Sequence, residues 1–367
     1  MDNDSTLNGN FSSNGQRFEE TQQFIASLEK YAVPIICSFG LIANTLSFTV
    51  FAQKFLRRKS CSIFLAARSL SDNGFLITLL VMWTSSVFDL NLSRIAGICQ
   101  VIVFFTYVFG CLSVWLVVFV TIENYIRICK PFMVNSLCQT TKAKYAVITL
   151  VVCTLCCYNF PLWTMTGQCT PKVKHYKFLR IMVYVDSVIT LVAPLIIMAF
   201  LLSRIALSSL SSCERHRRFS STSAQRISDL KTKVTTMLLA VTLIFITLNL
   251  PLHVVKLRLL VISFIKDQID VSTPVDLTVQ SISQLIYYLS LAINFVVYYI
   301  FGMSYRRTFI GLFSGRKKNV YSQTDYSTLA TSRTRKIGQS VQPASENGQS
   351  NYSIVNVQVK EAETRIE

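Results

Sequence analysis

The sequence predicts an all-α membrane protein, a seven-transmembrane helix bundle with a short amphipathic interfacial helix. Only 15% of the 367 residues are charged, against about 25% in soluble domains. A bilayer core about 30 Å thick needs roughly 20 helical residues to cross it. Uncharged runs close to or above this length occur at 31–53, 95–122, 145–171, 187–203, 234–255 and 277–305. These runs predict six transmembrane helices.

A seventh span is expected at 61–88. This stretch is uncharged apart from Arg68 and Asp72, which lie one helical turn apart on the same face. The sequence shows no strands of alternating apolar and polar residues, and only helices and closed barrels satisfy their backbone groups in lipid. Seven helices are therefore predicted.

The basic residues predict the orientation. If the N-terminus lies outside, the inner segments 54–59, 127–144, 204–233 and 306–367 contain 25 of the 36 Lys and Arg residues. Short inner loops of membrane proteins carry such an excess, so a multi-pass plasma-membrane protein with an extracellular N-terminus is expected. The net charge of +17 does not indicate a nucleic-acid partner, because the basic residues lie between the spans.

Four regions follow. Residues 1–30 are predicted to be a disordered extracellular N-terminus, without a cleavable signal peptide because no apolar stretch precedes residue 31. Residues 31–303 form the bundle. Residues 304–313 place basic and aromatic residues at helical spacing, which predicts an interfacial helix. Residues 314–367 are expected to be a disordered cytoplasmic tail with phosphorylatable Ser and Thr residues.

The predicted outer segments carry candidate covalent modifications. Sequons mark Asn3, Asn10 and Asn91 as glycosylation sites. Cys99, at the outer end of the third helix, and Cys169, in the following outer loop, both face an oxidising compartment, which predicts a disulfide bond between them.

Polar residues inside the spans are functional candidates, because they are costly in lipid. Asp72, Asn44, Ser113, Ser290 and Asn294 lie at similar depth. A carboxylate with hydroxyl and amide oxygens is suited to a small cation with its waters, so a sodium or water pocket is expected, with no other cofactor. The alternative is a polar network that only ties helices together.

Several motifs occur in the order of a known receptor family. They are Gly40-Leu-Ile-Ala-Asn44, Asp72, Cys99, Glu123-Asn124-Tyr125-Ile-Arg127-Ile-Cys-Lys-Pro131, Pro194, Phe245-Ile-Thr-Leu248-Asn249-Leu-Pro251 and Asn294-Phe295-Val-Val-Tyr298. Over roughly residues 31–313 the chain resembles a rhodopsin-like (class A) G-protein-coupled receptor, most like invertebrate neuropeptide receptors. The resemblance implies conformational switching by Glu123, Asn124, Tyr125, Arg127, Phe245, Asn249, Pro251 and Tyr298.

The chain departs from the family pattern at three positions. Asn124 replaces the arginine of the third helix, and Arg127 is the candidate substitute, forming a resting pair with Glu123; alternatively, Arg127 only reaches lipid headgroups. Phe295 replaces a proline, so the seventh helix should kink less. Arg68 is expected either to pair with Asp72, neutralising the cation pocket, or to reach the neighbourhood of Asn124.

The resemblance implies a ligand pocket between the outer halves of the third, fifth, sixth and seventh helices. Its candidate residues are Gln100, Phe104, Thr106, Tyr107, Asp186, His253, Lys256, Gln284 and Tyr288. Thr106 occupies the place of the aspartate that binds amines in this family, and 277–305 contains no lysine for a retinal Schiff base. The loop 169–180 alternates basic and apolar residues, which predicts a short strand over the pocket.

The expected function is that of a G-protein-coupled receptor for a neuropeptide, which transmits extracellular ligand binding to heterotrimeric G proteins by helix rearrangement. Kinases and arrestin at the tail and the lipid membrane complete the expected partners. Alternatives are a chemosensory or small-molecule receptor of the same fold, or a ligand-binding seven-helix protein that does not couple because Asn124 replaces the arginine. No nucleotide-binding or zinc-enzyme motif occurs, so no enzyme is expected.

Overall fold

The computed structural model describes residues 4–90, 95, 97–166, 170–216, 222–266 and 274–313. Within them, the side chains of 4–18, 209–216, 222–235, 259–260, 263–266 and 274 are not described. The predicted tail 314–367 lies outside the described residues, as do Asn3, Asn91 and Cys169.

The described chain is helical almost throughout. The long helices are α1 (Asp4–Phe51), α2 (Ser60–Val87), α3 (Ile98–Cys129), α5 (Thr140–Cys157), α7 (Tyr176–Ser187), α8 (Ala193–His216), α9 (Thr222–Lys266) and α10 (Pro274–Ala292). The shorter ones are η2 (Pro131–Met133), α4 (Val134–Leu137), α6 (Pro161–Thr164), η3 (Val173–His175), the π-helical turn η4 (Val188–Val192), α11 (Asn294–Phe301) and α12 (Met303–Phe313).

Within the described ranges, six helical segments are long and apolar enough to span a membrane, and the bent pair α10–α11 supplies the seventh. The fifth span joins α7, η4 and α8 into one segment, Val173–Ser208. The predicted seven-helix bundle is therefore confirmed.

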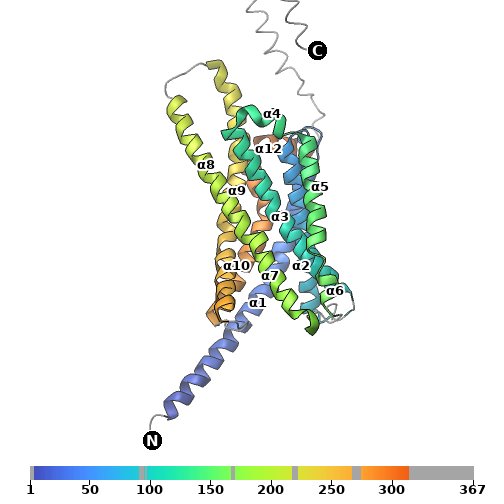
Figure 1. Cartoon of the computed structure of the whole chain (residues 1–367), viewed down its shortest axis with the longest axis vertical. Helices are drawn as coiled ribbons and strands as arrows, with labels where there is room; N and C mark the ends of the chain where they lie inside the picture. Colours follow the sequence, from blue (N-terminus) through green and yellow to red (C-terminus); the bar gives the residue numbers. More distant parts are fainter. Residues whose placement is uncertain are drawn as a thin grey trace, which may run out of the picture. The chain divides into compact units, whose positions relative to one another are not determined.

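Helix α3 lies at the centre of this bundle. It packs against α2, α5, α8 and α9, while α1 packs against α2 and α10 (Figure 1). Its buried face is formed largely by small and β-branched side chains such as Val117, Val118 and Val120, each fully buried. The small Ser113 and Thr121 on the same helix are buried as well, and residues of this size let neighbouring helices approach closely in a membrane.

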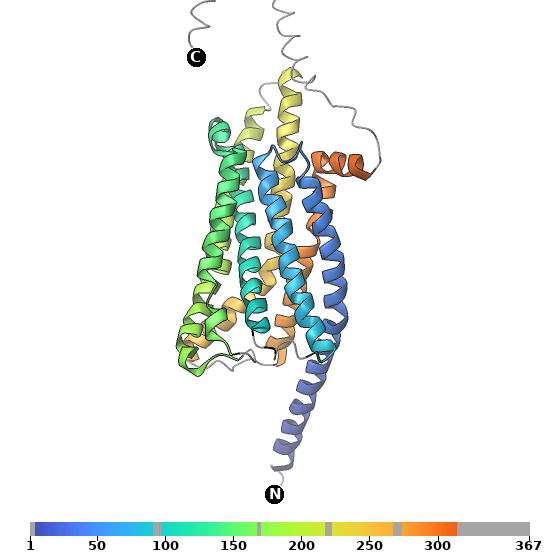
Figure 2. The same cartoon turned by 90° about the vertical axis from the view of Figure 1, so that its right-hand side faces the viewer.

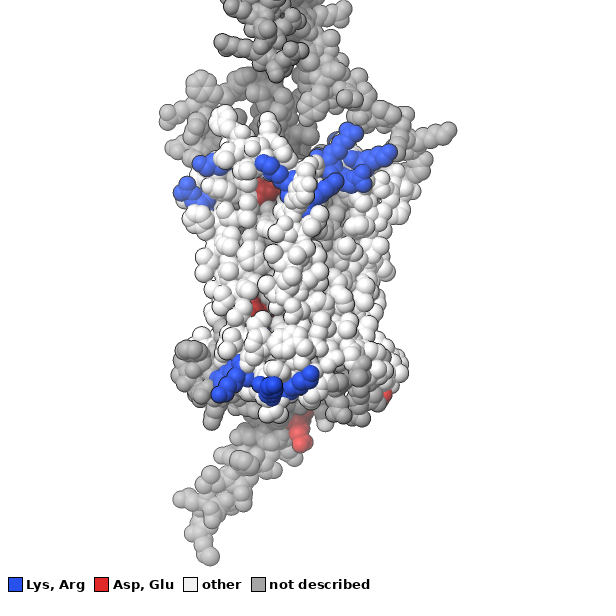
Figure 3. All heavy atoms as spheres, turned by 45° about the vertical axis from the view of Figure 1, so that its right-hand side comes forward, with Lys and Arg blue, Asp and Glu red and all other residues white. Residues whose placement is uncertain are grey.

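The outer surface of the bundle has the pattern of a membrane protein. Lys and Arg gather in two bands near the two ends, separated by a broad belt that shows no Lys or Arg on this face (Figure 3). Large apolar side chains such as Ile35, Ile148 and Ile196 are exposed on the surface. A continuous exposed apolar belt is favourable only against lipid.

The two ends of the bundle are distinct. Helix α12 runs across the bundle axis at the end opposite the N-terminus (Figure 2). Tyr305 anchors it, because its buried ring lies 5.0 Å from that of Phe51 and 5.7 Å from that of Tyr298. The helix predicted at 304–313 is present, and its end is called the α12 end below; the opposite end, which carries α6, is called the α6 end.

The N-terminal region differs from the expectation of disorder over 1–30. Helix α1 begins at Asp4, so the described residues 4–30 are helical. The segment 18–30 is rich in Glu, Gln, Ala, Leu and Lys, which are strong helix formers. The helix of the first span therefore continues beyond the apolar run.

The strand expected within 169–180 is also a wrong prediction for the described part of that loop. Only an isolated bridge between Met165 and Pro171 has β character, and Val173 already begins a helical segment. The basic residues fit helical spacing as well, since Arg180 donates from Nε to the hydroxyl of Tyr184, four residues on, at 3.3 Å.

The reduced kink expected from Phe295 is contradicted. The seventh span bends by 47° between α10 and α11. The side-chain amides of Asn44 and Asn294 both donate to the carbonyl of Leu291, at 3.1 and 3.2 Å. Because that carbonyl is the helical acceptor for residue 295, these side chains interrupt the helix without a proline.

Candidate functional site

A buried polar cluster lies in the middle of the bundle around Asp72. Ser113 Oγ of α3 donates to Asp72 Oδ1 at 2.5 Å, and Asn294 Nδ2 of α11 donates to Asp72 Oδ2 at 2.8 Å. All three side chains are at least 95% buried. The carboxylate therefore joins α2, α3 and the seventh span at the level of the bend.

Arg68 lies one turn before Asp72 and is fully buried. Its Nε lies 3.6 Å from Asp72 Oδ2, so the two side chains form an ion pair. Its Cζ lies 5.2 Å from the centroid of the Phe245 ring on α9, within the range of a cation–π contact. Of the two alternatives that the sequence left open, the structure shows the pair with Asp72.

The donor set around Asp72 does not fit the expected sodium ion. Ser113 and Asn294 each donate to one oxygen of the carboxylate, and Arg68 pairs with the oxygen that Asn294 also contacts, so the guanidinium takes the position beside the carboxylate where a cation would bind. Ser290 Oγ is directed to the carbonyl of Tyr287 at 2.7 Å and to Asn249 Oδ1 at 3.2 Å. Arg68 already neutralises the carboxylate, and two like charges about 4 Å apart repel by about 4 kcal/mol at an effective dielectric constant of roughly 20.

A second polar link joins α9 to α10. Asn249 Nδ2 donates to the carbonyl of Phe245 at 2.6 Å, and its Oδ1 accepts the Ser290 hydrogen bond. Asn249 stands two residues before Pro251, whose ring cannot donate to the helical ladder of α9. The residues predicted as the switch of the sixth helix therefore contact the seventh span through Ser290.

At the α12 end, Glu123 and Arg127 of α3 form an ion pair, with Arg127 Nε 3.0 Å from Glu123 Oε1. Ser60, the first residue of α2, donates to the same oxygen at 2.6 Å. Glu123 is buried, while the Arg127 side chain is 25% exposed. These three residues, called the α2–α3 clasp below, hold the ends of two helices together.

Asn124 lies beside the clasp but does not join it. It is fully buried, and neither side-chain atom has a hydrogen-bond partner among the described residues. Buried amides without partners are costly. Tyr125 is half-buried, and Tyr298 packs edge-on to Phe51 at a centroid distance of 5.0 Å.

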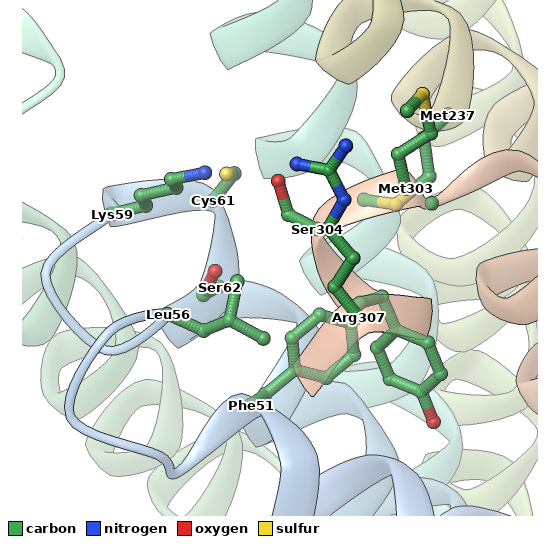
Figure 4. A pocket seen from close by; sticks show the side chains of 11 residues that line it. Phe51, Leu56, Lys59, Cys61, Ser62, Met237, Met303, Ser304 and Arg307 are labelled. Atoms are coloured by element: carbon green, nitrogen blue, oxygen red, sulfur yellow. The ribbon is translucent and has the colours of Figure 1, made fainter. Parts of the chain in front are cut away.

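A pocket opens at the α12 end between the α1–α2 loop, α9 and α12 (Figure 4). Its volume is about 690 Å³, including space open to solvent. Figure 4 shows Phe51 and Leu56 on its lower wall, with Lys59 and Arg307 near its upper edge. Burial lowers the pKa of the Lys59 ammonium from its usual value.

At the α6 end, an aromatic and charged cluster joins α3, α5 and α7. Tyr158 donates its hydroxyl to Asp186 Oδ1 at 2.8 Å and stacks on Tyr107, with ring centroids 5.6 Å apart. Lys256 of α9 interacts electrostatically with Asp186. The predicted residues Tyr107, Asp186 and Lys256 are thus brought together, and Phe160 packs against Tyr107 at 5.4 Å.

Three other predicted ligand residues make contacts with residues outside this group. Gln100 donates to the carbonyl of Met165 at 2.8 Å, and Thr106 donates to the carbonyl of Ile102, one turn before it in α3. Tyr288 packs against Phe75 at 6.1 Å, next to Gln284 on α10.

Two further ligand candidates are partly buried. Phe104 packs against the main core, and the Nδ1 of His253 is buried without a hydrogen bond within the described residues.

The described residues include only some of the predicted covalent modification sites. Cys99 is fully buried and disulfide-bonded, while its predicted partner Cys169 lies outside the described residues. Asn10 lies in α1, in the part whose side chains are not described. The three glycosylation sites and the Cys99–Cys169 pairing remain predictions.

Sequence reasoning missed Tyr158 and Ser60. Tyr158 stands at the end of an apolar run, where nothing distinguishes a core tyrosine from one that binds a carboxylate. Ser60 begins α2 next to basic residues. Its contact with Glu123, 63 residues later in the chain, depends on how α2 packs against α3. The hydroxyl of Tyr158 is recognised as functional only once the structure shows it donating to Asp186.

Comparison with known proteins gives concordant results. Residues 43–298 match the family model of the 7 transmembrane receptor (rhodopsin family). The chain is 29% identical over 150 residues to FMRFamide peptide receptor frpr-18 of Caenorhabditis elegans, covering 38% of this chain and 33% of that protein. It is 24% identical over 226 residues to the FMRFamide receptor of Drosophila melanogaster, covering 56% of this chain and 38% of that protein.

The matches thus span 33% and 38% of the length of these curated relatives. The family model, in contrast, covers more than half of this chain and includes α2, α3, α9 and the bent seventh span. The chain therefore belongs to the rhodopsin family of seven-transmembrane receptors and is not an enzyme, as the sequence predicted.

Proposed function

We propose that this chain is a plasma-membrane receptor for a neuropeptide, with its N-terminus outside, and that it transmits peptide binding to heterotrimeric G proteins. The observation that carries the proposal is its similarity to two receptors named for FMRFamide. The excess of Lys and Arg in the segments at the α12 end supports a cytoplasmic position for that end.

The cluster at the α6 end suits a peptide with aromatic and basic groups. FMRFamide contains two phenylalanines and an arginine, and Asp186 offers a carboxylate beside the rings of Tyr107 and Tyr158. A guanidinium bound there would compete with the Tyr158 hydroxyl and Lys256 for the carboxylate. Aromatic walls around a charge-assisted bond are a common basis of peptide recognition.

The output is a population shift between helix arrangements. A peptide that favours one arrangement can move the equilibrium only by its difference in affinity for the two. The α2–α3 clasp and the Asp72 cluster are the buried contacts that such a shift would rearrange. Peptide binding and G-protein binding are then linked reciprocally.

The direct test is peptide-stimulated nucleotide exchange on G proteins in membranes that contain the full chain. FMRFamide-type peptides should stimulate exchange, and a peptide of scrambled sequence should not. Asp186→Asn should weaken peptide potency about tenfold or more, because a charge-assisted bond is worth roughly 1.5–3 kcal/mol. Asp89→Asn, at the same end but outside the cluster, serves as the matched control. Equal potencies for Asp186→Asn and the parent would contradict the binding role.

One observation favours a second candidate, a ligand-binding seven-helix protein that does not couple. Asn124 stands where the family has arginine, and its side chain is buried without a partner among the described residues. Saturable peptide binding without nucleotide exchange on any G protein of a mixed set would establish this candidate. Kinases and arrestin, expected to act on the tail, remain part of the proposal.

A further inference from the structure

Arg68 is among the largest of the fully buried side chains that the structure describes, and it stands in the middle of a membrane-spanning helix. A buried guanidinium is expensive in lipid unless charges or dipoles around it compensate. Its ion-pair partner within the described residues is Asp72, and its three nitrogens make no hydrogen bond there. The pair therefore brings one positive and one negative charge to the same level of the bundle.

The surroundings of the guanidinium connect it to other spans. Phe245 of α9 offers its ring face at 5.2 Å, and Asn294 of the seventh span shares the carboxylate oxygen Oδ2 with Arg68. The guanidinium thus lies between α2, α9 and the seventh span. A mobile cation held by Asp72 would have to occupy the same space.

We propose that Arg68 is a tethered cation that takes the place of a sodium ion in the polar core, so that this receptor is insensitive to sodium. The guanidinium supplies the positive charge that the Asp72 carboxylate needs, and it is attached to the protein, so the charge cannot dissociate. Removing the arginine should leave the carboxylate with two donors, Ser113 and Asn294, and with room for an ion and its waters. Sodium should then bind.

The test is thermal unfolding of the purified full-length receptor in detergent, in sodium chloride or in choline chloride at equal ionic strength. Unfolding exposes the buried free thiols of Cys37, Cys61 and Cys111 to a thiol-reactive dye. The melting temperature of the parent should differ by less than about 1 °C between the two salts. Arg68→Leu should gain about 3 °C or more in sodium, in a saturable manner, because an ion that binds the folded state stabilises it.

Two control variants separate charge from packing. Arg68→Lys keeps a positive charge and should remain insensitive to sodium. The double variant Arg68→Leu with Asp72→Asn lacks both charges and should also show no sodium effect. Neither measurement needs the receptor's ligand, so its outcome is independent of the peptide test.

Saturable stabilisation of the parent by sodium would overturn the proposal, and this arm is informative even if no Arg68 variant folds. A folded Arg68→Leu variant that shows no sodium effect would overturn it as well, because the arginine would then not be what excludes the ion.

Discussion

Ser60 and Glu123 join the first residue of α2 to the last turns of α3, with Ser60 Oγ donating to Glu123 Oε1 at 2.6 Å. Arg127 pairs with the same carboxylate from one turn further along α3. Two side chains, Ser60 and Arg127, therefore donate to one oxygen of Glu123. The next residue, the buried Asn124, stands where the family has an arginine. The contact between Ser60 and Glu123 would break if the ends of α2 and α3 moved apart.

Arg127→Ala should raise basal nucleotide exchange roughly fivefold. The pair is partly exposed, so its loss should shift the equilibrium by about 1 kcal/mol toward the separated arrangement. Exchange assays on membranes measure this, with Lys130→Ala, an exposed neighbour, as control. If Arg127→Ala and Asn124→Arg both leave exchange unchanged, the clasp has no switching role.

Gly40→Ala should lower the melting temperature by several degrees. A Cβ at Gly40 would lie 2.6 Å from Leu76 Cδ1 and 3.0 Å from Ala292 Cβ, so the Leu76 side chain would have to turn away and α10 would have to give way slightly. Overpacking of this kind costs typically 1–3 kcal/mol. Gly311→Ala is the matched control, because a Cβ there meets no atom within 4 Å among those described. Equal melting temperatures for the two variants would refute close packing at Gly40.

Tyr158→Phe should destabilise the receptor by about 2 kcal/mol. The change removes a hydrogen bond to a carboxylate that is partly buried, and leaves Asp186 Oδ1 without that donor. Thermal unfolding measures the loss, and Tyr145→Phe, at a side chain 67% exposed on the same span, is the control. A loss of the same size in both variants would show that the hydroxyl of Tyr158 has no special role.

Peptide mapping of the non-reduced protein should recover Cys99 linked to Cys169. Cys99 is disulfide-bonded and fully buried, and Cys169 is the cysteine that the predicted topology places in the same outer region. Cys153, a free cysteine exposed on α5, should be recovered unlinked. A Cys99 peptide joined to any other cysteine would disprove the predicted pairing.

Much of the fold was predictable because the bilayer imposes one dominant rule, a run of about 20 uncharged residues for each span. Six spans were located by this rule, the seventh at 61–88 despite its two charged residues, and α12 by its basic and aromatic spacing. The fifth span was predicted at 187–203 but extends over Val173–Ser208. The rule gives no information about segments outside the bilayer. Charge counting gives no information on whether a helix continues into water, as α1 does before Tyr31.

The site was less predictable, because its geometry depends on side-chain direction across helices. The four-residue spacing of Arg68 and Asp72 allowed a pair, but it did not exclude a second position near Asn124. The distance of 3.6 Å between Arg68 Nε and Asp72 Oδ2 in the folded bundle decides between them. The reduced kink was wrong for a related reason: the expectation considered the missing proline at Phe295 and not the amides of Asn44 and Asn294, which take the Leu291 carbonyl.

The Leu291 carbonyl, and not a proline, is the group at which the seventh span bends. A proline imposes a bend through covalent geometry and keeps it in every state of the protein. Here the bend is held by two amide contacts, one of which comes from the first helix. The angle is therefore not fixed by covalent geometry: if a small rotation of α1 withdrew Asn44 and a new rotamer withdrew Asn294, the acceptor would return to residue 295, the hinge would straighten, and Tyr298 and α12 would swing along with it.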